Sequence, residues 1–358
     1  MGDGFRGGAR VLAAGTALGL GLGKAAAGAL ASPPEADLRG EVALVTGGSR
    51  GLGLALGREL VRQGCRLAIC ARDETELARA RADLERIPEA AGNVLAIPCD
   101  VTDRAQVAAM VERILAEEGR IDILVNNAGI MVVAPLETLT HADVERVLAT
   151  DLWGTLNPTL AVLPGMRARG AGRIVNITSI GGKIAVPHML PYTVAKFAAA
   201  GLSAGLRAEL AGAGIAVTTV VPGLMRTGSH LHAEFGGDRQ AEYRWFALGA
   251  SAPYPIAIDA GRAARIIVRA VKRGQAECAF PLATMLVGRL SGVFPGATAQ
   301  ALAIVDRLLP DPPSHPAGTA PGSAVAAASE SPLLHAATTL GRAAAADYNQ
   351  RPPQPEPA

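Results

Sequence analysis

The sequence predicts an α/β protein built on a doubly wound parallel sheet, and three observations lead to that prediction. Between about residues 40 and 282, short apolar runs alternate with longer stretches of helical periodicity. The apolar runs are continuous, as expected for strands that are covered on both faces. No linker and no internal repeat divides this region, so we expect one domain.

Each element follows from its local pattern. The expected strands are 42–45, 66–70, 94–98, 121–125, 173–178, 215–221 and 276–280. The expected helices are 51–63, 74–87, 104–118, 142–167, 191–211 and a segment capped by Asp259 that ends at Lys272. Strands joined by helices of this length pair in parallel.

The chain divides into four parts. Residues 1–38 form a Gly/Ala-rich leader, and 39–282 form the α/β domain. Residues 283–309 form a helical extension, with a break expected at Pro295. The tail, 310–358, is rich in Pro, Ala and Ser with little periodicity, which predicts disorder.

Charge and cysteine usage exclude several classes of function. The net charge of +2 gives no reason to expect nucleic acid as a partner. The four cysteines have no metal-binding spacing, His230 and His232 lack a third ligand, and we expect no metal. Reduced thiols favour the cytoplasm. The apolar run at 11–23 is interrupted as a membrane span, so membrane association through the leader is the alternative.

The first expected strand runs into a glycine-rich turn, TGGSRGLG at 46–53. A strand, a glycine turn and a helix start direct backbone N–H groups and the helix dipole toward a phosphate. Glycines at these positions let a pyrophosphate approach the backbone. This context predicts a Rossmann-type dinucleotide site. The expected cofactor contacts are Thr46, Gly47, Ser49, Arg50, Gly51, Leu52 and Gly53.

Tyr192 and Lys196 lie four residues apart on an expected helix and therefore share one face. A free phenol titrates near pH 10, too high for ready proton transfer at pH 7. A fixed ammonium nearby favours the phenolate. Because the chain has only four lysines and otherwise uses Arg, this lysine looks required. The pair predicts general acid–base chemistry.

Together these motifs resemble the short-chain dehydrogenase/reductase family. NNAG at 126–129, Ser179 thirteen residues before Tyr192, and PGxxxT at 222–227 agree with it in order, and the resemblance covers about 40–282. It implies hydride transfer between a nicotinamide cofactor and a carbonyl or alcohol, with Tyr192 as general acid, Lys196 supporting it and Ser179 holding the substrate oxygen. It adds as cofactor contacts Asp100, Val101, Asn126, Ala128, Gly129, Tyr192, Lys196, Pro222, Gly223 and Thr227.

One position departs from the family pattern. The family usually has Asn in a V-N-x-x-G context on its long central helix, whereas this chain has TDLWG at 150–154. Asp151 therefore replaces an Asn that supports a proton relay through water. We include Asp151 in the catalytic group, because an ionised carboxylate would either disfavour the Tyr192 phenolate or take part in the relay itself.

The end of the second strand bears on cofactor choice. An enzyme that prefers NAD usually has an acidic residue there for the ribose 2′-OH. This chain has Arg72 instead, and both Arg72 and Arg50 suit a 2′-phosphate. We therefore expect NADP(H) rather than NAD(H). Asp73 is placed to cap the next helix.

The substrate pocket is the least constrained part of the site. Its candidates are Trp153, His188, Met189, Leu190, Leu224, Tyr243, Trp245, Phe246 and Tyr254. This cluster suits a hydrophobic carbonyl or alcohol as substrate. The alternative is that the aromatic side chains only close this lobe of the fold and do not bind substrate. The alternatives are a 3-oxoacyl thioester ketoreductase and a catalytically weak NADPH-binding sensor, the latter supported only by Asp151. The resemblance also implies a homodimer or homotetramer formed through long helices.

Overall fold

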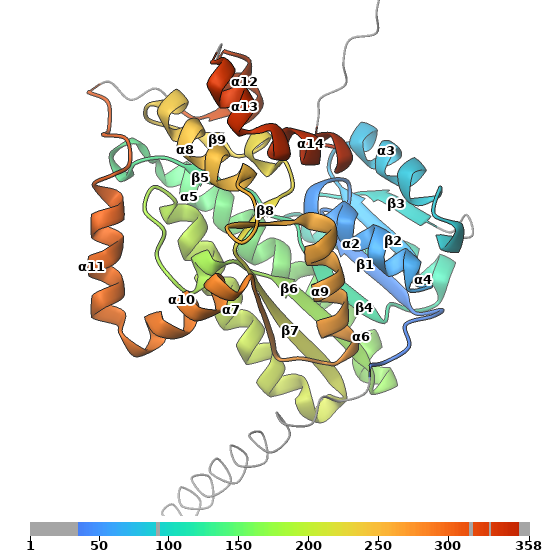
Figure 1. Cartoon of the computed structure of the whole chain (residues 1–358). Helices are drawn as coiled ribbons and strands as arrows, with labels where there is room; N and C mark the ends of the chain where they lie inside the picture. The colour runs from blue at the N-terminus through green and yellow to red at the C-terminus, as the bar shows by residue number, and fades with distance from the viewer. Residues whose placement is uncertain (1–34, 91–93, 315–317, 329–330, 351–358) are drawn as a thin grey trace, which may run out of the picture. The chain divides into compact units, whose positions relative to one another are not determined.

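The computed structural model describes residues 35–90, 94–314, 318–328 and 331–350 (Figure 1). The leader prediction for 1–34 and the end of the tail, 351–358, lie outside these residues. All elements named below belong to the compact unit formed by residues 37–358.

The centre of this unit is a seven-stranded parallel sheet in the order β11-β7-β6-β4-β1-β2-β3. The strands are β1 (Val42–Thr46), β2 (Arg66–Ala71), β3 (Val94–Pro98), β4 (Ile123–Asn126), β6 (Gly172–Ile177), β7 (Ile215–Pro222) and β11 (Glu277–Phe280). The chain runs outward from β1 to β3 and then crosses to β4 on the other side of β1. This reversal is the switch point at which doubly wound folds bind ligands.

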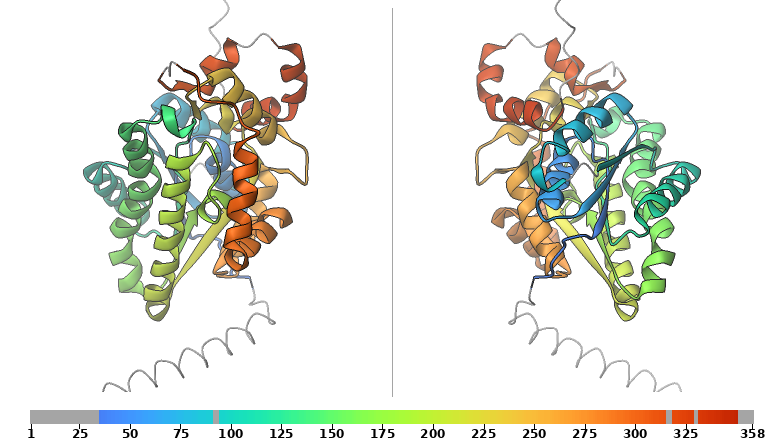
Figure 2. Two further views of the ribbon diagram at one scale, coloured as in Figure 1. Left: turned by 90° about the vertical axis from the view of Figure 1, so that its left-hand side faces the viewer. Right: turned by 90° about the vertical axis from the view of Figure 1, so that its right-hand side faces the viewer.

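Helices cover both faces of the sheet (Figure 2). One layer holds α2 (Gly51–Arg62), α3 (Glu74–Leu84) and α9 (Ala260–Lys272), and the other holds α4 (Arg104–Glu118), α6 (Gly154–Arg169) and α7 (Leu190–Leu210). The predicted caps are confirmed: Asp73 accepts from the Glu76 N–H at 2.8 Å, and Asp259 accepts from the Arg262 N–H at 2.9 Å. The predicted fold class is confirmed.

The long central helix differs from the single helix expected over 142–167. It begins as α5 (His141–Leu148), passes through a π-helical turn at Ala149–Trp153 and continues as α6. A π-helical turn inserts one extra residue and changes the direction of the side chains that follow. Here it contains Asp151, whose side chain is fully buried.

A smaller lobe stands over the carboxyl ends of the strands. It contains β5 (Val132–Val133), β8 (Leu224–Arg226), β9 (Glu234–Phe235), α8 (Arg239–Ser251) and β10 (Ala257–Asp259). Beside it, α10 (Leu282–Val293) and α11 (Pro295–Asp306) are separated at Pro295, as the sequence predicts.

The sequence predicted disorder for 310–358, whereas residues 318–328 and 331–350 contain regular elements. These residues form β12 (Ala320–Pro321), α12 (Gly322–Ala327), α13 (Pro332–Ala337) and α14 (Thr339–Asp347). β12 pairs with β9, and Val325, Ala345 and Tyr348 are buried. The helices are short and bury mostly small side chains, so they leave no clear hydrophobic period in the sequence.

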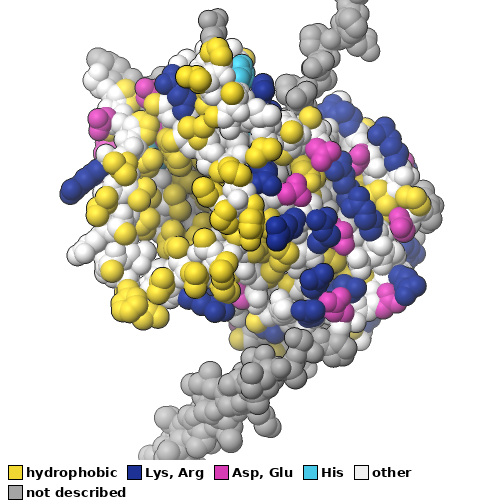
Figure 3. Space-filling view, in the orientation of Figure 1, with side chains coloured by type: hydrophobic (Ala, Val, Ile, Leu, Met, Phe, Trp, Pro, Cys, Tyr) yellow, Lys and Arg dark blue, Asp and Glu magenta, His cyan; other side chains and the backbone are white. Residues whose placement is uncertain are grey.

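Large apolar side chains are exposed on α10 and α11, among them Leu286, Leu290 and Ile304. Figure 3 shows hydrophobic side chains gathered on the side of the molecule that carries these helices. Among the residues described here, no helix has the length and apolar character needed to cross a membrane.

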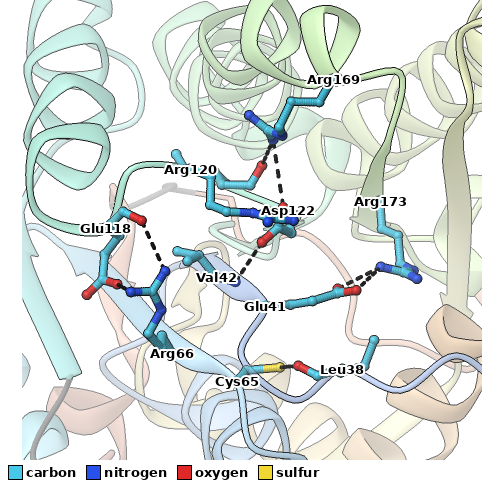
Figure 4. A network of polar contacts seen from close by, with 11 residues as sticks. Leu38, Glu41, Val42, Cys65, Arg66, Glu118, Arg120, Asp122, Arg169 and Arg173 are labelled. Atoms are coloured by element: carbon cyan, nitrogen blue, oxygen red, sulfur yellow. Dashed lines mark hydrogen bonds and ion pairs between the residues drawn. The ribbon is translucent and has the colours of Figure 1, made fainter.

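A polar network joins the amino ends of four strands, at the edge of the sheet away from the switch point (Figure 4). Its centre is Asp122, which is buried and accepts from the Val42 N–H at 2.9 Å and from Arg120 at 2.7 Å. Arg173 on β6 pairs at 2.6 Å with Glu41, which lies just before β1, so this ion pair spans the intervening strand β4. The network fixes where these strands begin.

We expect Asp122→Ala to lower the free energy of unfolding by about 2 kcal/mol, because the buried Val42 N–H and two arginines lose their acceptor. Urea denaturation measures the change. The matched control is Glu117→Ala, which removes an exposed pair with Arg113 and should cost under about 0.5 kcal/mol. Equal losses in the two variants would contradict a structural role for Asp122.

Candidate active site

A cavity of about 1050 Å³ opens at the carboxyl ends of the strands and extends under the smaller lobe. Most residues predicted from the sequence as site residues line it. These are Gly47, Ser49, Arg50, Gly51, Leu52, Arg72, Asp100, Val101, Ala128, Gly129, Asp151, Ser179, Tyr192, Lys196, Pro222, Gly223 and Thr227. Among the predicted catalytic and cofactor-binding residues, the three that do not line it are Thr46, Gly53 and Asn126.

These three residues support the cavity wall through contacts with the neighbouring backbone and core. The Thr46 hydroxyl accepts from the N–H groups of Asn127 and Ala128 at 3.0 and 3.1 Å. Asn126 points into the core and donates to Thr159 and Asn176, each at 2.9 Å. A Cβ on Gly53 would lie 2.0 Å from the Gly47 carbonyl oxygen, so only glycine fits there. Asn127, which was not among the predicted site residues, also lines the cavity.

The glycine turn has the geometry of a phosphate site. Gly47 and Gly51 have φ angles of +61° and +57°, a region that favours glycine. A Cβ on Gly47 would lie 2.9 Å from the Ala128 Cα, so the turn and the loop after β4 are in close contact. The first turn of α2 directs its N–H groups toward the cavity. These residues fit the phosphates of a dinucleotide.

The two arginines expected to bind a 2′-phosphate differ in how closely a carboxylate holds each of them. Arg50 donates to both carboxylate oxygens of Glu76, at 2.8 and 2.9 Å. Glu76 lines the cavity and has no counterpart in the sequence prediction. Arg72 is 65% exposed and lies 4.0 Å from Asp100, so it remains available for an anion.

Tyr192 and Lys196 project from the first turns of α7. The Lys196 Nζ lies 5.4 Å from the centroid of the Tyr192 ring and donates to the Ile177 carbonyl at 3.2 Å. It also lies 3.0 Å from the Oδ2 atom of Asp151. The ammonium is therefore fixed between the end of β6 and the π-helical turn, beside the phenol.

Asp151 contacts the lysine of this group and accepts from the Ile130 N–H at 2.8 Å through its other oxygen. Burial raises the pKa of Asp151, although the Lys196 charge and the Ile130 N–H oppose that shift. Burial disfavours the charge on Lys196, but the carboxylate of Asp151 outweighs it and raises the pKa of Lys196. Lys196 consequently stays protonated across the physiological range.

Ser179 stands at the end of β6, where a 3-10 turn begins at Ile180. Its hydroxyl accepts from the Gly181 N–H at 3.0 Å. A Cβ on Gly181 would lie 3.3 Å from the Tyr192 ring and 3.5 Å from the Ser179 oxygen. The serine and the tyrosine therefore flank the same glycine at the cavity wall.

The far half of the cavity is apolar. Four of the candidates from the sequence line it: Met189, Leu224, Trp245 and Phe246. Met131, Val186 and Met225 join them. This half can enclose a hydrophobic group next to Tyr192.

The other candidates lie elsewhere. Trp153, Leu190 and Tyr254 are exposed, and Tyr243 packs on Phe235 in the core of the smaller lobe. His188 Nδ1 lies 2.7 Å from Glu242, away from the cavity lining. Tyr243 and Trp245 both lie on α8, but Tyr243 faces the core of the smaller lobe and Trp245 faces the cavity. Their spacing along the sequence did not reveal this difference.

Comparison with known proteins identifies the family. A family model described as short chain dehydrogenase matches residues 41–234, which is more than half of the chain. The chain belongs to the short-chain dehydrogenase family. Members of this family are oxidoreductases that use a nicotinamide cofactor.

The sequence relatives of this chain carry different names. The "Dehydrogenase/reductase SDR family protein 7-like" of Anopheles gambiae is 39% identical over 202 residues, 56% of this chain and 63% of that protein. The match thus spans less than two thirds of that relative. A "Putative ketoacyl reductase" of Streptomyces coelicolor is 40% identical over 52% of this chain and 71% of its own length.

Among solved structures, a short-chain dehydrogenase from Streptomyces avermitilis superposes with a TM-score of 0.62 at 30% identity. The superposition covers 75% of this chain and 98% of that one. The parallel sheet and its helices are therefore shared, while part of this chain lies outside the match.

Proposed function

We propose that this short-chain dehydrogenase uses NADP(H) to interconvert a carbonyl and a secondary alcohol on a hydrophobic small molecule. The observation that carries the proposal is the buried Lys196 ammonium, held by Asp151 and Ile177 beside the Tyr192 ring. That arrangement opens on a cavity whose far half is apolar.

The residues divide the chemistry between them. A nicotinamide cofactor held in this cavity would supply hydride in reduction and accept it in oxidation. Tyr192 donates its phenolic proton to the carbonyl oxygen, and takes it back in the reverse direction. The Ser179 hydroxyl donates a hydrogen bond to that oxygen as negative charge develops on it. Lys196 stabilises the phenolate electrostatically. The N–H groups of Leu52 and Gly53, in the first turn of α2, would hold the phosphates of the cofactor.

A panel of carbonyl compounds tests the proposal. The consumption of NADPH is followed by the absorbance of reduced nicotinamide at about 340 nm. Hydrophobic ketones should be reduced faster than small polar ones of equal intrinsic reactivity. Binding of NADPH without turnover of any member would support the alternative of a catalytically weak sensor.

A second candidate is a 3-oxoacyl thioester ketoreductase, which the name of the Streptomyces coelicolor relative favours. The apolar half of the cavity suits an acyl chain as well as a ring system. The same panel separates the two if it includes 3-oxoacyl thioesters. A preference for these over every simple ketone would establish the second candidate.

Arg72 provides a prediction on cofactor choice. Because Arg50 is neutralised by Glu76 and Arg72 is free to bind an anion, Arg72→Ala should weaken NADPH binding about 10-fold and leave NADH binding unchanged. Fluorescence titration measures both dissociation constants. Arg113→Ala, which alters an exposed arginine on α4, is the control. Equal weakening for both cofactors would count against a 2′-phosphate contact.

We also propose a homodimer or homotetramer formed through the long helices. Val194 and Phe197 on α7 and Leu160 on α6 are exposed apolar side chains on these helices. Light scattering after size exclusion should show an oligomer for the native chain and a smaller species for Phe197→Glu. A native monomer would refute this part of the proposal.

For the compartment we propose the cytoplasm, where the four unpaired cysteines would stay reduced. Membrane association through the leader is the alternative. Cell fractionation of the chain with and without residues 1–35 decides between them. If the leader is a membrane anchor, its deletion should move the protein from the membrane fraction to the soluble fraction.

A further inference from the structure

The end of the described chain lies directly on the phosphate-binding turn. The Gly51 N–H, the first of α2, donates to the Tyr348 carbonyl at 2.9 Å. The Asn349 side chain donates to the carbonyls of Ser49 and Glu76, at 2.8 and 3.0 Å. Residues 348–350, which we call the C-terminal clasp, therefore touch both the turn and α3. The family match ends at residue 234, so the clasp lies outside it.

Several contacts fix the clasp in this position. Arg58 on α2 lies over the Tyr348 ring, 5.3 Å from its centroid, and donates to the Asp347 carbonyl at 2.7 Å. The Tyr348 hydroxyl accepts from the Gly261 N–H at 2.9 Å. Asn349 adopts a left-handed conformation with φ of +55°, which turns the chain toward the cavity. The clasp is thus bound to α2 and α9.

Gln350 completes the clasp and faces the cavity. The residue is only 3% exposed and lines the cavity wall. Its Nε2 atom lies 2.7 Å from the position that a Cβ on Gly51 would occupy. Its Oε1 atom is buried and has no hydrogen-bond partner within the described residues. Its backbone carbonyl is held by the His232 ring, with Nε2 at 3.1 Å.

A buried amide oxygen without a partner is costly unless a ligand supplies one. The neighbouring N–H groups point to the kind of ligand. Gly51 has given its N–H to Tyr348, and the N–H groups of Leu52 and Gly53 form no bond within the described part of the chain. The Gln350 amide lies beside Gly51 at the start of α2, where these two N–H groups and the helix dipole favour an anion.

We propose that Gln350 is a cofactor-binding residue that completes the phosphate site from the C-terminus. Its side-chain N–H donates to a phosphate oxygen of the dinucleotide, in place of the Gly51 N–H, and its Oε1 accepts from a ribose hydroxyl. The inference rests on the proposed function in one respect, that the ligand is a nicotinamide dinucleotide. It assigns a part of the binding site to residues outside the matched family region.

The experiment measures binding without turnover. Dissociation constants for NADPH and NADH are determined by fluorescence titration of the full chain, with no substrate present. Gln350→Ala should weaken both cofactors about 10-fold, because the contact is to a part that they share. Gln350→Glu should weaken both by at least about 30-fold, since it adds a negative charge beside a phosphate. Gln300→Ala, which alters an exposed glutamine on α11, should change neither dissociation constant.

Thermal unfolding supplies a second readout and a check on folding. Both Gln350 variants should unfold close to the native temperature without cofactor, and should gain less from saturating NADPH than the native chain does at the same concentration. Native affinity in Gln350→Ala would overturn the inference. Tighter binding would also overturn it, since the clasp would then compete with the cofactor. If the native chain bound neither cofactor, the proposed function itself would fail, whatever the variants did.

Discussion

Replacing Tyr192 by Phe is expected to lower kcat at least about 1000-fold while leaving the dissociation constant of NADPH within a few-fold of its native value. The change removes one oxygen and keeps the ring, which lies 5.4 Å from the Lys196 ammonium. The carbonyl oxygen then has no acid to protonate it as hydride arrives. In the proposed mechanism the glycine turn and Lys196 hold the cofactor, and the substitution alters neither.

Steady-state kinetics with the best substrate from the carbonyl panel, together with a fluorescence titration of NADPH, measure both quantities. Tyr254→Phe is the matched control, because Tyr254 is exposed and stacks on Arg262 outside the cavity. It should retain native kcat. If the Tyr192 variant kept even a tenth of native turnover, the proton would have to come from another group and the proposed mechanism would be wrong.

Local patterns in the sequence were sufficient for the scaffold and for the central part of the site. Continuous apolar runs locate the seven parallel strands, and Asp73 and Asp259 mark two helix starts. The glycine turn and the four-residue spacing of Tyr192 and Lys196 depend on short-range geometry. Such features are set by neighbours along the chain, so a single sequence shows them.

Contacts between distant segments were not predictable in the same way. Glu76 neutralises Arg50 from another helix, which leaves the expected pair of arginines with one free member. The clasp reaches the glycine turn from 300 residues away, through a tail whose composition indicates disorder. No periodicity records such pairings, because they depend on how the finished domain brings the segments together.

The ion pair between Asp151 and Lys196 also depends on such a contact. The sequence places Asp151 near Tyr192 through the family pattern, whereas the structure shows its carboxylate on the lysine, 3.0 Å from Nζ. The π-helical turn at Ala149–Trp153 produces this placement. The pair lies in a site where neither side chain has much contact with water, so each charge depends on the other.

We therefore expect Lys196→Met to lower kcat/KM about 1000-fold, since the phenolate loses a positive charge several ångströms away in a partly dry site. Asp151→Asn keeps that ammonium and should retain activity, with the alkaline limb of its pH profile moved to lower pH because Lys196 is no longer partly neutralised. A collapse of activity in Asp151→Asn would instead show that the carboxylate itself carries protons.

Stability gives an independent measurement on the same pair. In Lys196→Met the Asp151 carboxyl keeps the burial that raises its pKa and loses the lysine that opposes this shift. An acid whose pKa is raised on folding contributes stability that is present below its unfolded value, near 3.8, and is lost as pH rises through the folded value. The variant should therefore lose unfolding free energy as pH rises above that unfolded value, relative to the double variant Asp151→Asn/Lys196→Met. The double variant has no carboxyl to ionise, so it should recover stability at pH 8 while remaining inactive. Parallel pH profiles for the single and double variants, obtained by urea denaturation, would mean that Asp151 is not the buried counter-charge of Lys196.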